Sequence, residues 1–463
     1  MEADCEKLVA KLAALFQRHK GRIVVYTGAG ISTSASIPDY RGTNGLWVTP
    51  KASASSGNSK SSNKCKPGAK RKQNVTTDTW KLRLPEATMA CPTYTHMALR
   101  VLVKSGYVRH IVSQNVDGLH VRSGLSRKRL SELHGNLFFE QCLLCYSVIM
   151  RAFDVAETTG RNQHLTGRIC PKCRVSIPDR WLKAAEALDS SVKIPREPNS
   201  LQSGESVVRA YKLAASKIAK VATSDKTQNP VLTTLPFLRD VIVHYYERQA
   251  SSALTKVYRV AEAIEAIHGR NPIRAAVSAS LGQPTDTEEP PTLLHAPWFK
   301  RMLPTFQASH SVEQPSTKTA TSDTDWDDPA TLIVVMGSSL SVLRSYGFLW
   351  PQGLGRCLHE VPSTSRRRQI VPDRTEPVGC RLAIINLQPT CKDGLADLVI
   401  HAHCDRVLES LMRDYLALDV PGYDYKLDDP LYRHAIPLEP EEECTRTRPN
   451  IPFHLFKSEV ERT

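Results

Sequence analysis

Four cysteines in two closely spaced pairs are the clearest chemical signal in the sequence. Cys142 and Cys145 form one C-x2-C pair, and Cys170 and Cys173 form a second pair after 24 intervening residues. Each pair can place two thiolates on one metal ion, and two pairs complete the four-sulfur tetrahedron that zinc adopts in structural sites. Because protein ligands fill every position, the spacing predicts one structural Zn²⁺ ion with no open position for water.

A second signal comes from polar residues that directly follow short apolar runs. Gly28-Ala29-Gly30-Ile31-Ser32 follows the first run, Gln114-Asn115-Val116-Asp117 the second, and Glu132-Leu133-His134-Gly135 ends a third. Glycines let a backbone approach a pyrophosphate, and a helix N-terminus would offer it free N–H groups. A plain tight turn remains an alternative for the glycines, and a buried structural imidazole remains one for His134. No single segment therefore decides the function.

The elements that position these residues alternate between strands and helices. We expect strands at Arg22–Thr27, Tyr107–Ser113, Ala330–Gly337, Arg381–Asn386 and Ala396–Ile400, and helices at Met1–Lys20, Pro92–Lys104 and Cys404–Leu418. This order predicts an α/β fold, a Rossmann-like parallel sheet with helices on both faces, plus a small four-cysteine zinc-binding module. In such a sheet the residues at the carboxyl ends of the strands meet in one crevice.

Charge is distributed unevenly along the chain. The formal net charge is +14, and half of it equals the seven basic residues of one stretch without acidic residues, Lys51, Lys60, Lys64, Lys66, Lys70, Arg71 and Lys72. This stretch is either a nuclear-import or nucleic-acid-binding patch or a solvated linker. Arg366–Arg368 is a second basic spot. No apolar run has the length of a transmembrane helix, and without an export signal the 12 cysteines are expected to stay reduced.

Together the motifs resemble those of the sirtuins. Gly28–Ser32 is similar to the GAGIS motif of that family, Ile37–Gly42 to its PDFRG element and Gln114–Asp117 to its QNxD motif. Leu133–Gly135, Gly337–Leu340 and Asn386–Gln388 are similar to the HG, GSSL and NLQ elements, in the family order. The resemblance is strongest to class IV, especially its seventh, nuclear and nucleolar type, and it leaves the basic stretch and two long insertions uncovered.

The resemblance implies NAD as cofactor and assigns roles to individual residues. His134 would be the general base, and Asn115 would fix the nicotinamide ribose. The other residues expected near NAD are Gly28, Ala29, Gly30, Ser32, Asp39, Tyr40, Arg41, Gln114, Asp117, Gly337, Ser338, Ser339, Asn386, Leu387, Gln388 and Cys404. Val243, Tyr245 and Glu247 would bind the substrate peptide, although Tyr246 replaces the glycine of the family's V-x-F-G-E element.

The resemblance thus implies an NAD-dependent protein-lysine deacylase, a deacetylase in the family's usual reaction, that forms nicotinamide and O-acyl-ADP-ribose. Acylated lysine proteins, histones above all, are the expected partners, with nucleic acid or nucleosome contact through Lys51–Lys72, no membrane, and a nuclear or nucleolar location. The alternatives are a weakly active chromatin scaffold and a mono-ADP-ribosyltransferase. A generic Rossmann oxidoreductase is disfavoured, because no acidic residue stands about twenty positions after the glycines.

The chain is expected to divide into a core with inserted segments. Residues 1–137 form the first part of the core, with a basic disordered insertion at 51–79, and residues 138–178 form the zinc module. An insertion at 179–235 precedes a substrate-binding segment at 236–248, and another insertion spans 249–325. Residues 326–420 complete the core, and 421–463 form an irregular tail.

Overall fold

The computed structural model describes residues 2–37, 87–160, 164–174, 237–244, 247, 257–282, 292–310, 326–351, 353–354, 379–438, 442 and 445–446. The predictions for Asp39, Tyr40, Arg41 and Tyr245, for the basic insertion 51–79 and for the insertion 179–235 lie outside these residues. No helix among the described residues is long and apolar enough to cross a membrane.

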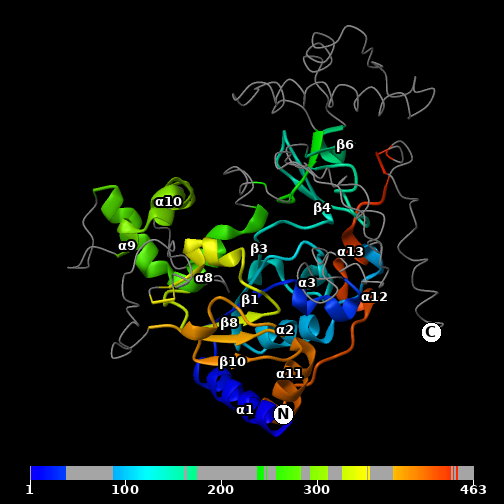
Figure 1. The fold of residues 1–463 in the computed structure, drawn as a ribbon. Helices are drawn as coiled ribbons and strands as arrows, with labels where there is room; N and C mark the ends of the chain where they lie inside the picture. Colours follow the sequence, from blue (N-terminus) through cyan, green and yellow to red (C-terminus); the bar gives the residue numbers. More distant parts are fainter. Residues whose placement is uncertain are drawn as a thin grey trace, which may run out of the picture.

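Six strands form one parallel sheet in the order β10-β9-β8-β1-β2-β3 (Figure 1). They are β1 (Ile23–Thr27), β2 (Val108–Ser113), β3 (Leu130–Glu132), β8 (Leu332–Met336), β9 (Arg381–Ile385) and β10 (Leu398–Ile400). All five predicted strands are present, with each end at most two residues inside the predicted bound, and β3 adds a sixth. The order matches that of Rossmann folds, in which the direction of the crossovers reverses between β1 and its neighbour β8.

The central strands form because their residues are apolar without alternation. Every residue of β1 and of β8 is buried, which is the pattern of a parallel strand covered on both faces. One cover consists of α2 (Tyr94–Lys104) and α11 (Cys404–Ser410), which pack together, while α1 (Glu2–Arg18) packs against β10. The predicted helix 404–418 changes after α11 into the π-helical turn η11 (Leu411–Tyr415).

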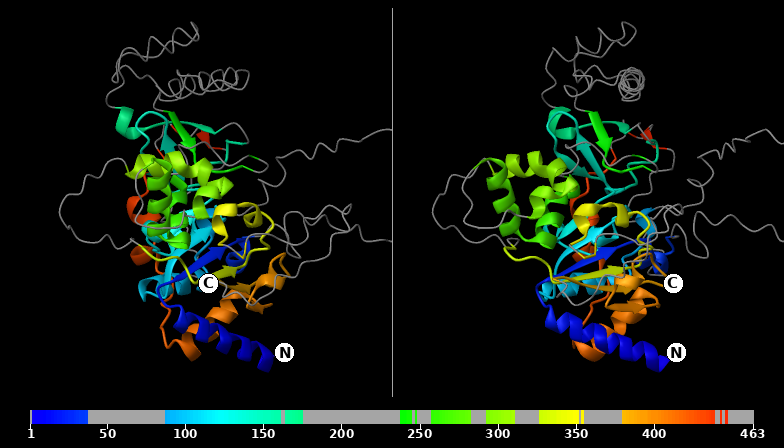
Figure 2. Two further views of the ribbon diagram at one scale, coloured as in Figure 1. Left: turned by 90° about the vertical axis from the view of Figure 1, so that its left-hand side faces the viewer. Right: turned by 60° about the vertical axis from the view of Figure 1, so that its left-hand side comes forward.

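The other cover comes from a segment expected to be an insertion. Helix α8 (Val260–His268) packs on β2 and β3, and its apolar residues at helical spacing, Ala263, Ile264 and Ile267, are fully buried. Helices α9 (Arg270–Ser280) and α10 (Pro297–His310) pack together beside it, on the side of the sheet opposite α2 and α11 (Figures 1 and 2). The predicted insertion 249–325 therefore contains a helix that completes the core.

The zinc module contains a second sheet, which is antiparallel, in the order β5-β4-β7-β6. Its strands are β4 (Phe139–Cys142), β5 (Val148–Met150), β6 (Leu165–Ile169) and β7 (Phe237–Asp240), and the single helical turn α4 (Pro171–Arg174) follows β6. This sheet lies at the end of the molecule opposite α1 (Figure 2). Since β7 belongs to the predicted substrate-binding segment, that segment begins as a strand of the zinc module.

Part of the tail is ordered against the rest of the chain, which corrects the expectation of an irregular tail. It forms α12 (Tyr425–Asp428) and α13 (Pro430–His434), each begun by an aspartate that accepts backbone N–H bonds. The buried Asp429 carboxylate lies 2.9 Å from the Nε of Arg122 in α3 (Leu119–Arg122). Helices this short leave no apolar periodicity in the sequence, which is why the prediction missed them.

Short 3-10 turns complete the described elements. They are η1 (Ala29–Ile31), η2 (Thr33–Ala35), η3 (Ala87–Met89), η4 (Arg127–Arg129), η6 (Thr292–His295), η7 (Leu343–Ser345), η8 (Gly347–Leu349) and η10 (Asp393–Leu395).

Candidate active site and zinc site

The glycine turn after β1 packs directly on the backbone that follows β8. The Gly30 N–H donates to the Gly337 carbonyl at 2.8 Å, and the Gly28 N–H donates to that of Met336 at 3.0 Å. A Cβ atom would lie 2.7 Å from the Gly337 oxygen at Gly28 and 2.8 Å from the Gly337 Cα at Gly30. Only glycine fits here, so the two strand ends form a backbone-walled cradle of the kind that a pyrophosphate requires.

The turn does not open an α-helix as predicted. It continues as η1 and η2, in which the Ile31 N–H bonds to Gly28 and the Ser32 N–H to Ala29. The N–H groups of Gly28, Gly30, Ile31 and Ser32 thus have partners within the protein, whereas a helix N-terminus was expected to leave such groups free. The cradle fits a dinucleotide through close backbone approach rather than through a set of free donors at a helix start.

Amide and carboxylate side chains connect the ends of three neighbouring strands. The Asn115 Nδ2 group donates to the Gly28 carbonyl at 3.2 Å and to the Ser32 hydroxyl at 3.3 Å. The Ser32 hydroxyl donates to Asp117 at 2.7 Å, and the Gln114 Nε2 group donates to the Ser338 hydroxyl at 2.9 Å. Burial raises the pKa of Asp117, although its bonds from the Leu119 N–H and Ser32 oppose this rise.

The ring of His134 is fixed by a hydrogen bond to the backbone of Gln114. Its Nδ1 atom lies 2.9 Å from the Gln114 carbonyl oxygen. Because a carbonyl only accepts hydrogen bonds, we assign the proton to Nδ1, and the neutral ring then carries its lone pair on Nε2. Burial lowers the pKa of His134, and the bond to Gln114 opposes this only in part, so the ring is neutral at pH 7. Nε2 is therefore able to accept a proton.

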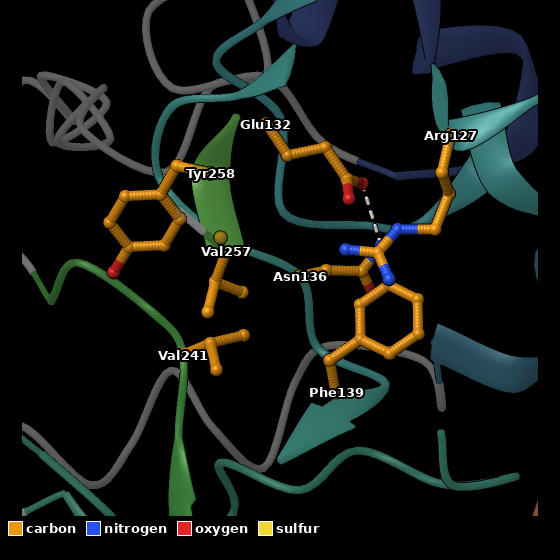
Figure 3. A pocket seen from close by; sticks show the side chains of 8 residues that line it. Arg127, Glu132, Asn136, Phe139, Val241, Val257 and Tyr258 are labelled. Atoms are coloured by element: carbon orange, nitrogen blue, oxygen red, sulfur yellow. Dashed lines mark hydrogen bonds between the residues drawn. The ribbon is translucent and has the colours of Figure 1, made fainter. Parts of the chain in front are cut away.

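Gly135 brings the substrate-binding segment against His134. Its φ is +86°, and a Cβ atom there would lie 1.8 Å from the Val241 carbonyl oxygen. The Val243 N–H donates to the His134 carbonyl at 2.9 Å. Figure 3 shows a small pocket beside this contact, with Glu132 bonded to Asn136 at 2.6 Å. Burial raises the pKa of Glu132 to about 7.

A network of histidines and carboxylates ties the same segment to the zinc module. Asp240 is fully buried and lies 2.8 Å from His164 Nδ1 and 3.0 Å from His244 Nε2. His164 Nε2 lies 2.7 Å from the carboxylate of Glu247, which also accepts the His244 N–H. These separations are hydrogen-bond lengths, so the network fixes the segment on both sides of residues 241–244.

The four predicted zinc ligands lie together. The Sγ atoms of Cys142 and Cys173 are 4.0 Å apart, those of Cys145 and Cys170 are 3.8 Å apart, and all four lie within 4.8 Å of one another. Tetrahedral Zn–S bonds of about 2.3 Å require sulfur separations of about 3.8 Å. The donor set therefore fits one Zn²⁺ ion.

Several of the other residues predicted to lie near NAD are at or near the ends of β8 and β9. The Asn386 side chain donates to the Gln388 carbonyl at 2.6 Å, which closes its own turn and leaves Leu387 exposed. Cys404 is buried below this turn, and its thiol points to the Ile385 carbonyl at 3.7 Å. Ser339 pairs with Ser341, which follows it in the same loop. These residues thus lie near the carboxyl ends of the strands, as Gly28 and Gln114 do.

Sequence reasoning missed two residues that touch this site. The Tyr346 hydroxyl lies 3.0 Å from His134 Nε2, and the Thr27 hydroxyl lies 2.9 Å from the Nε2 of the buried His120. Tyr346 stands between two 3-10 turns, where the sequence carries no periodic signal. His120 lies in α3, after β2, and the pairing of Thr27 with Ser113 does not by itself bring this histidine to Thr27.

Comparison with known proteins agrees with this geometry. The model of the Sir2 family matches residues 28–267. The NAD-dependent protein deacetylase sirtuin-7 of Rattus norvegicus is 30% identical over 452 residues, which cover 97% of this chain and 70% of the relative. The NAD-dependent protein deacetylase Sirt6 of Drosophila melanogaster is 44% identical over 162 residues, or 34% of this chain and 43% of the relative.

Solved structures of Sir2 enzymes are also similar to the chain. One of them covers 89% of this chain and 100% of its own chain, with 17% sequence identity and a TM-score of 0.39. The match of the family model to residues 28–267 includes Gly28, Gly30, Asn115, Asp117, His134 and all four zinc ligands. The chain belongs to the Sir2 family.

Proposed function

We propose that this chain is an NAD-dependent protein-lysine deacylase in which His134 is the general base. The proposal rests above all on the ring of His134, whose Nδ1 proton is engaged by the Gln114 carbonyl so that Nε2 offers its lone pair. A base must be neutral at working pH and must reach the proton that it takes, and the lowered pKa of His134 meets the first requirement.

The chain's own residues divide the work of binding and orientation. Gly28 and Gly30 provide close backbone approach for the phosphates, while Asn115 and Asp117 hold the nicotinamide half through the network with Ser32. Gln114 has two tasks, since its carbonyl fixes the tautomer of His134 and its side chain joins Ser338 across the sheet. Ser339, Asn386, Gln388 and Cys404 border the adenosine half. NAD, when bound, supplies the electrophilic ribose carbon that accepts the acyl oxygen of the substrate lysine.

The substrate side is formed by the segment after β7. Val243 pairs with the His134 backbone at 2.9 Å, and Glu247 is fixed by His164 and by the His244 N–H. An extended acylated peptide would add to this segment by main-chain pairing. A peptide bound in this way would lie beside the base, as transfer from lysine to ribose requires.

We further propose that the substrates are acylated histones or other chromatin proteins and that the protein acts in the nucleus, including the nucleolus. The support is electrostatic: the net charge is +14, and Lys51–Lys72 contains basic residues without acidic ones. Such a stretch favours polyanionic partners through counterion release. Deletion of residues 51–72 should lower the affinity for DNA and make this affinity less dependent on salt. If the deletion variant and the wild type bind DNA equally well at each salt concentration, the nucleic-acid contact is contradicted.

The catalytic proposal is tested with a panel of acylated histone peptides. Wild type with NAD should release nicotinamide and O-acyl-ADP-ribose from at least one peptide, and His134→Tyr should lose this activity while it still binds zinc. Equal turnover by the variant would remove His134 from its role. Transfer of radiolabelled ADP-ribose to protein, without deacylation, would instead support the mono-ADP-ribosyltransferase, and no turnover on any acyl length would support the scaffold.

A further inference from the structure

The lone pair that His134 needs for catalysis is already engaged in the free protein. Nδ1 carries the ring proton, so Nε2 can only accept, and the partner 3.0 Å away is the hydroxyl group of Tyr346. The Tyr346 hydroxyl is therefore the donor. Burial raises the pKa of Tyr346, which keeps this hydroxyl protonated and able to donate throughout the neutral range.

The backbone around Tyr346 is anchored by its neighbours, whereas the side chain is partly exposed. Its ring stacks on Phe348 at 5.7 Å between centroids, and the Trp350 indole N–H donates to the Leu343 carbonyl at 2.9 Å, which anchors the segment. Tyr346 itself is only partly buried, and its neighbours Ser345 and Gly347 are exposed. The backbone is thus held on both sides, while the tyrosine side chain packs against the core and stays partly exposed.

One lone pair cannot accept from two hydroxyl groups. If His134 takes a proton from a ribose hydroxyl of the bound dinucleotide, that hydroxyl must occupy the position that Tyr346 holds in the free protein. We propose that Tyr346 is a positioning residue that occupies Nε2 of His134 until the ribose diol displaces it. This inference rests on the proposed function, since it concerns the same base.

The displaced bond has two measurable consequences. First, dinucleotide binding must break one hydrogen bond, which lowers the affinity by about fivefold, the equivalent of one ordinary hydrogen bond. Second, a donor on Nε2 favours the neutral ring and so lowers the pKa of His134, in addition to the effect of burial. The nearby carboxyls of Asp117 and Glu132 bond to Ser32 and Asn136, and Gln114 contributes an uncharged carbonyl.

Four proteins separate these effects: wild type, Tyr346→Phe, His134→Ala and the double variant. NAD affinity is measured by calorimetry, and the His134 titration by NMR of ¹³C-labelled histidine, in which the His134 signal is identified by its loss in His134→Ala. We expect Tyr346→Phe to bind NAD about fivefold more tightly and to raise the pKa of His134. In the His134→Ala background the same substitution should leave NAD affinity unchanged. Tyr107→Phe is the matched control, because Tyr107 precedes β2 and the site lies at the other end of that strand. It should leave both the NAD affinity and the His134 pKa unchanged.

The two proposals fail differently. A wild type that deacylates no peptide contradicts the proposed function, yet the NMR titration still reports whether Tyr346 bonds to His134. Unchanged NAD affinity and an unchanged His134 pKa in Tyr346→Phe would overturn the inference even if the wild type is active. An equal gain in affinity with and without His134 would also overturn it, because Tyr346 would then act by steric hindrance alone.

Discussion

Substitution of Gly135 by alanine tests how closely the substrate-binding segment is seated on the catalytic histidine. The added Cβ would lie 1.8 Å from the Val241 oxygen, whereas ordinary contact begins at 3.4 Å, so the carbonyl must retreat by about 1.6 Å. Such a shift breaks the bond from the Val243 N–H to the His134 carbonyl, which is worth about 1 kcal/mol. The left-handed backbone at φ +86° costs a further 1–2 kcal/mol or so for a residue with a side chain.

The chain offers a matched control for the backbone part of this cost. Gly106 has a similar φ of +72°, but a Cβ atom there would meet nothing within 4 Å. We expect Gly106→Ala to lower the free energy of unfolding by about 1–2 kcal/mol and Gly135→Ala to lower it by about 3 kcal/mol or more. Urea unfolding followed by circular dichroism measures both, and titration with an acylated peptide should show weaker binding for Gly135→Ala alone. Equal losses in the two variants would refute the close contact with Val241.

Three further perturbations test other parts of the structure. Cys145→Ser should abolish stoichiometric zinc in metal analysis and lower the melting temperature, and a variant that keeps one zinc per chain would contradict the four-sulfur site. Asp429→Asn leaves Arg122 buried without its counter-charge and should cost about 3 kcal/mol or more in urea unfolding. Asp328→Asn, in which both the aspartate and its partner Arg22 are exposed, should cost less than about 1 kcal/mol; equal costs would refute the role of burial. Burial lowers the pKa of His120 to about 3, so the unfolded chain takes up a proton near pH 6.5 that the folded chain refuses. The contribution of His120 to stability is therefore present above pH 6.5 and is lost as the pH falls below it. Between pH 7.5 and 5.5 the free energy of unfolding of wild type should fall by about 1.4 kcal/mol more than that of His120→Gln. Parallel pH profiles of the two proteins would contradict the burial of His120.

The sequence was sufficient for those parts of the fold that depend on local signals. The run at 332–336 is apolar throughout, which is typical of a strand covered on both faces, and the structure buries every residue of β8. The zinc ligands were predictable for the same reason, because each C-x2-C pair is complete within four residues. The strand ends then placed Gly28, Gln114 and His134 at one edge without further information.

Contacts between distant positions could not be predicted in this way. Arg122 and Asp429 are separated by 307 positions, and the sequence around neither residue indicates a buried ion pair. The bond between Tyr346 and His134 spans 212 positions and depends on the path of the loop after β8, which local sequence does not encode. The expected free N–H groups after Gly28 were wrong because the turn tightens into 3-10 geometry, which a G-x-G pattern does not distinguish from an α-helical start.

The most direct test of the central claim is a product analysis by mass spectrometry. Wild type is incubated with NAD and an acetylated histone peptide, and nicotinamide, O-acetyl-ADP-ribose and deacetylated peptide are quantified together. The assignment of His134 as base predicts equal amounts of the three products from wild type and none above background from His134→Tyr. Formation of NADH, or full product formation by His134→Tyr, would contradict it.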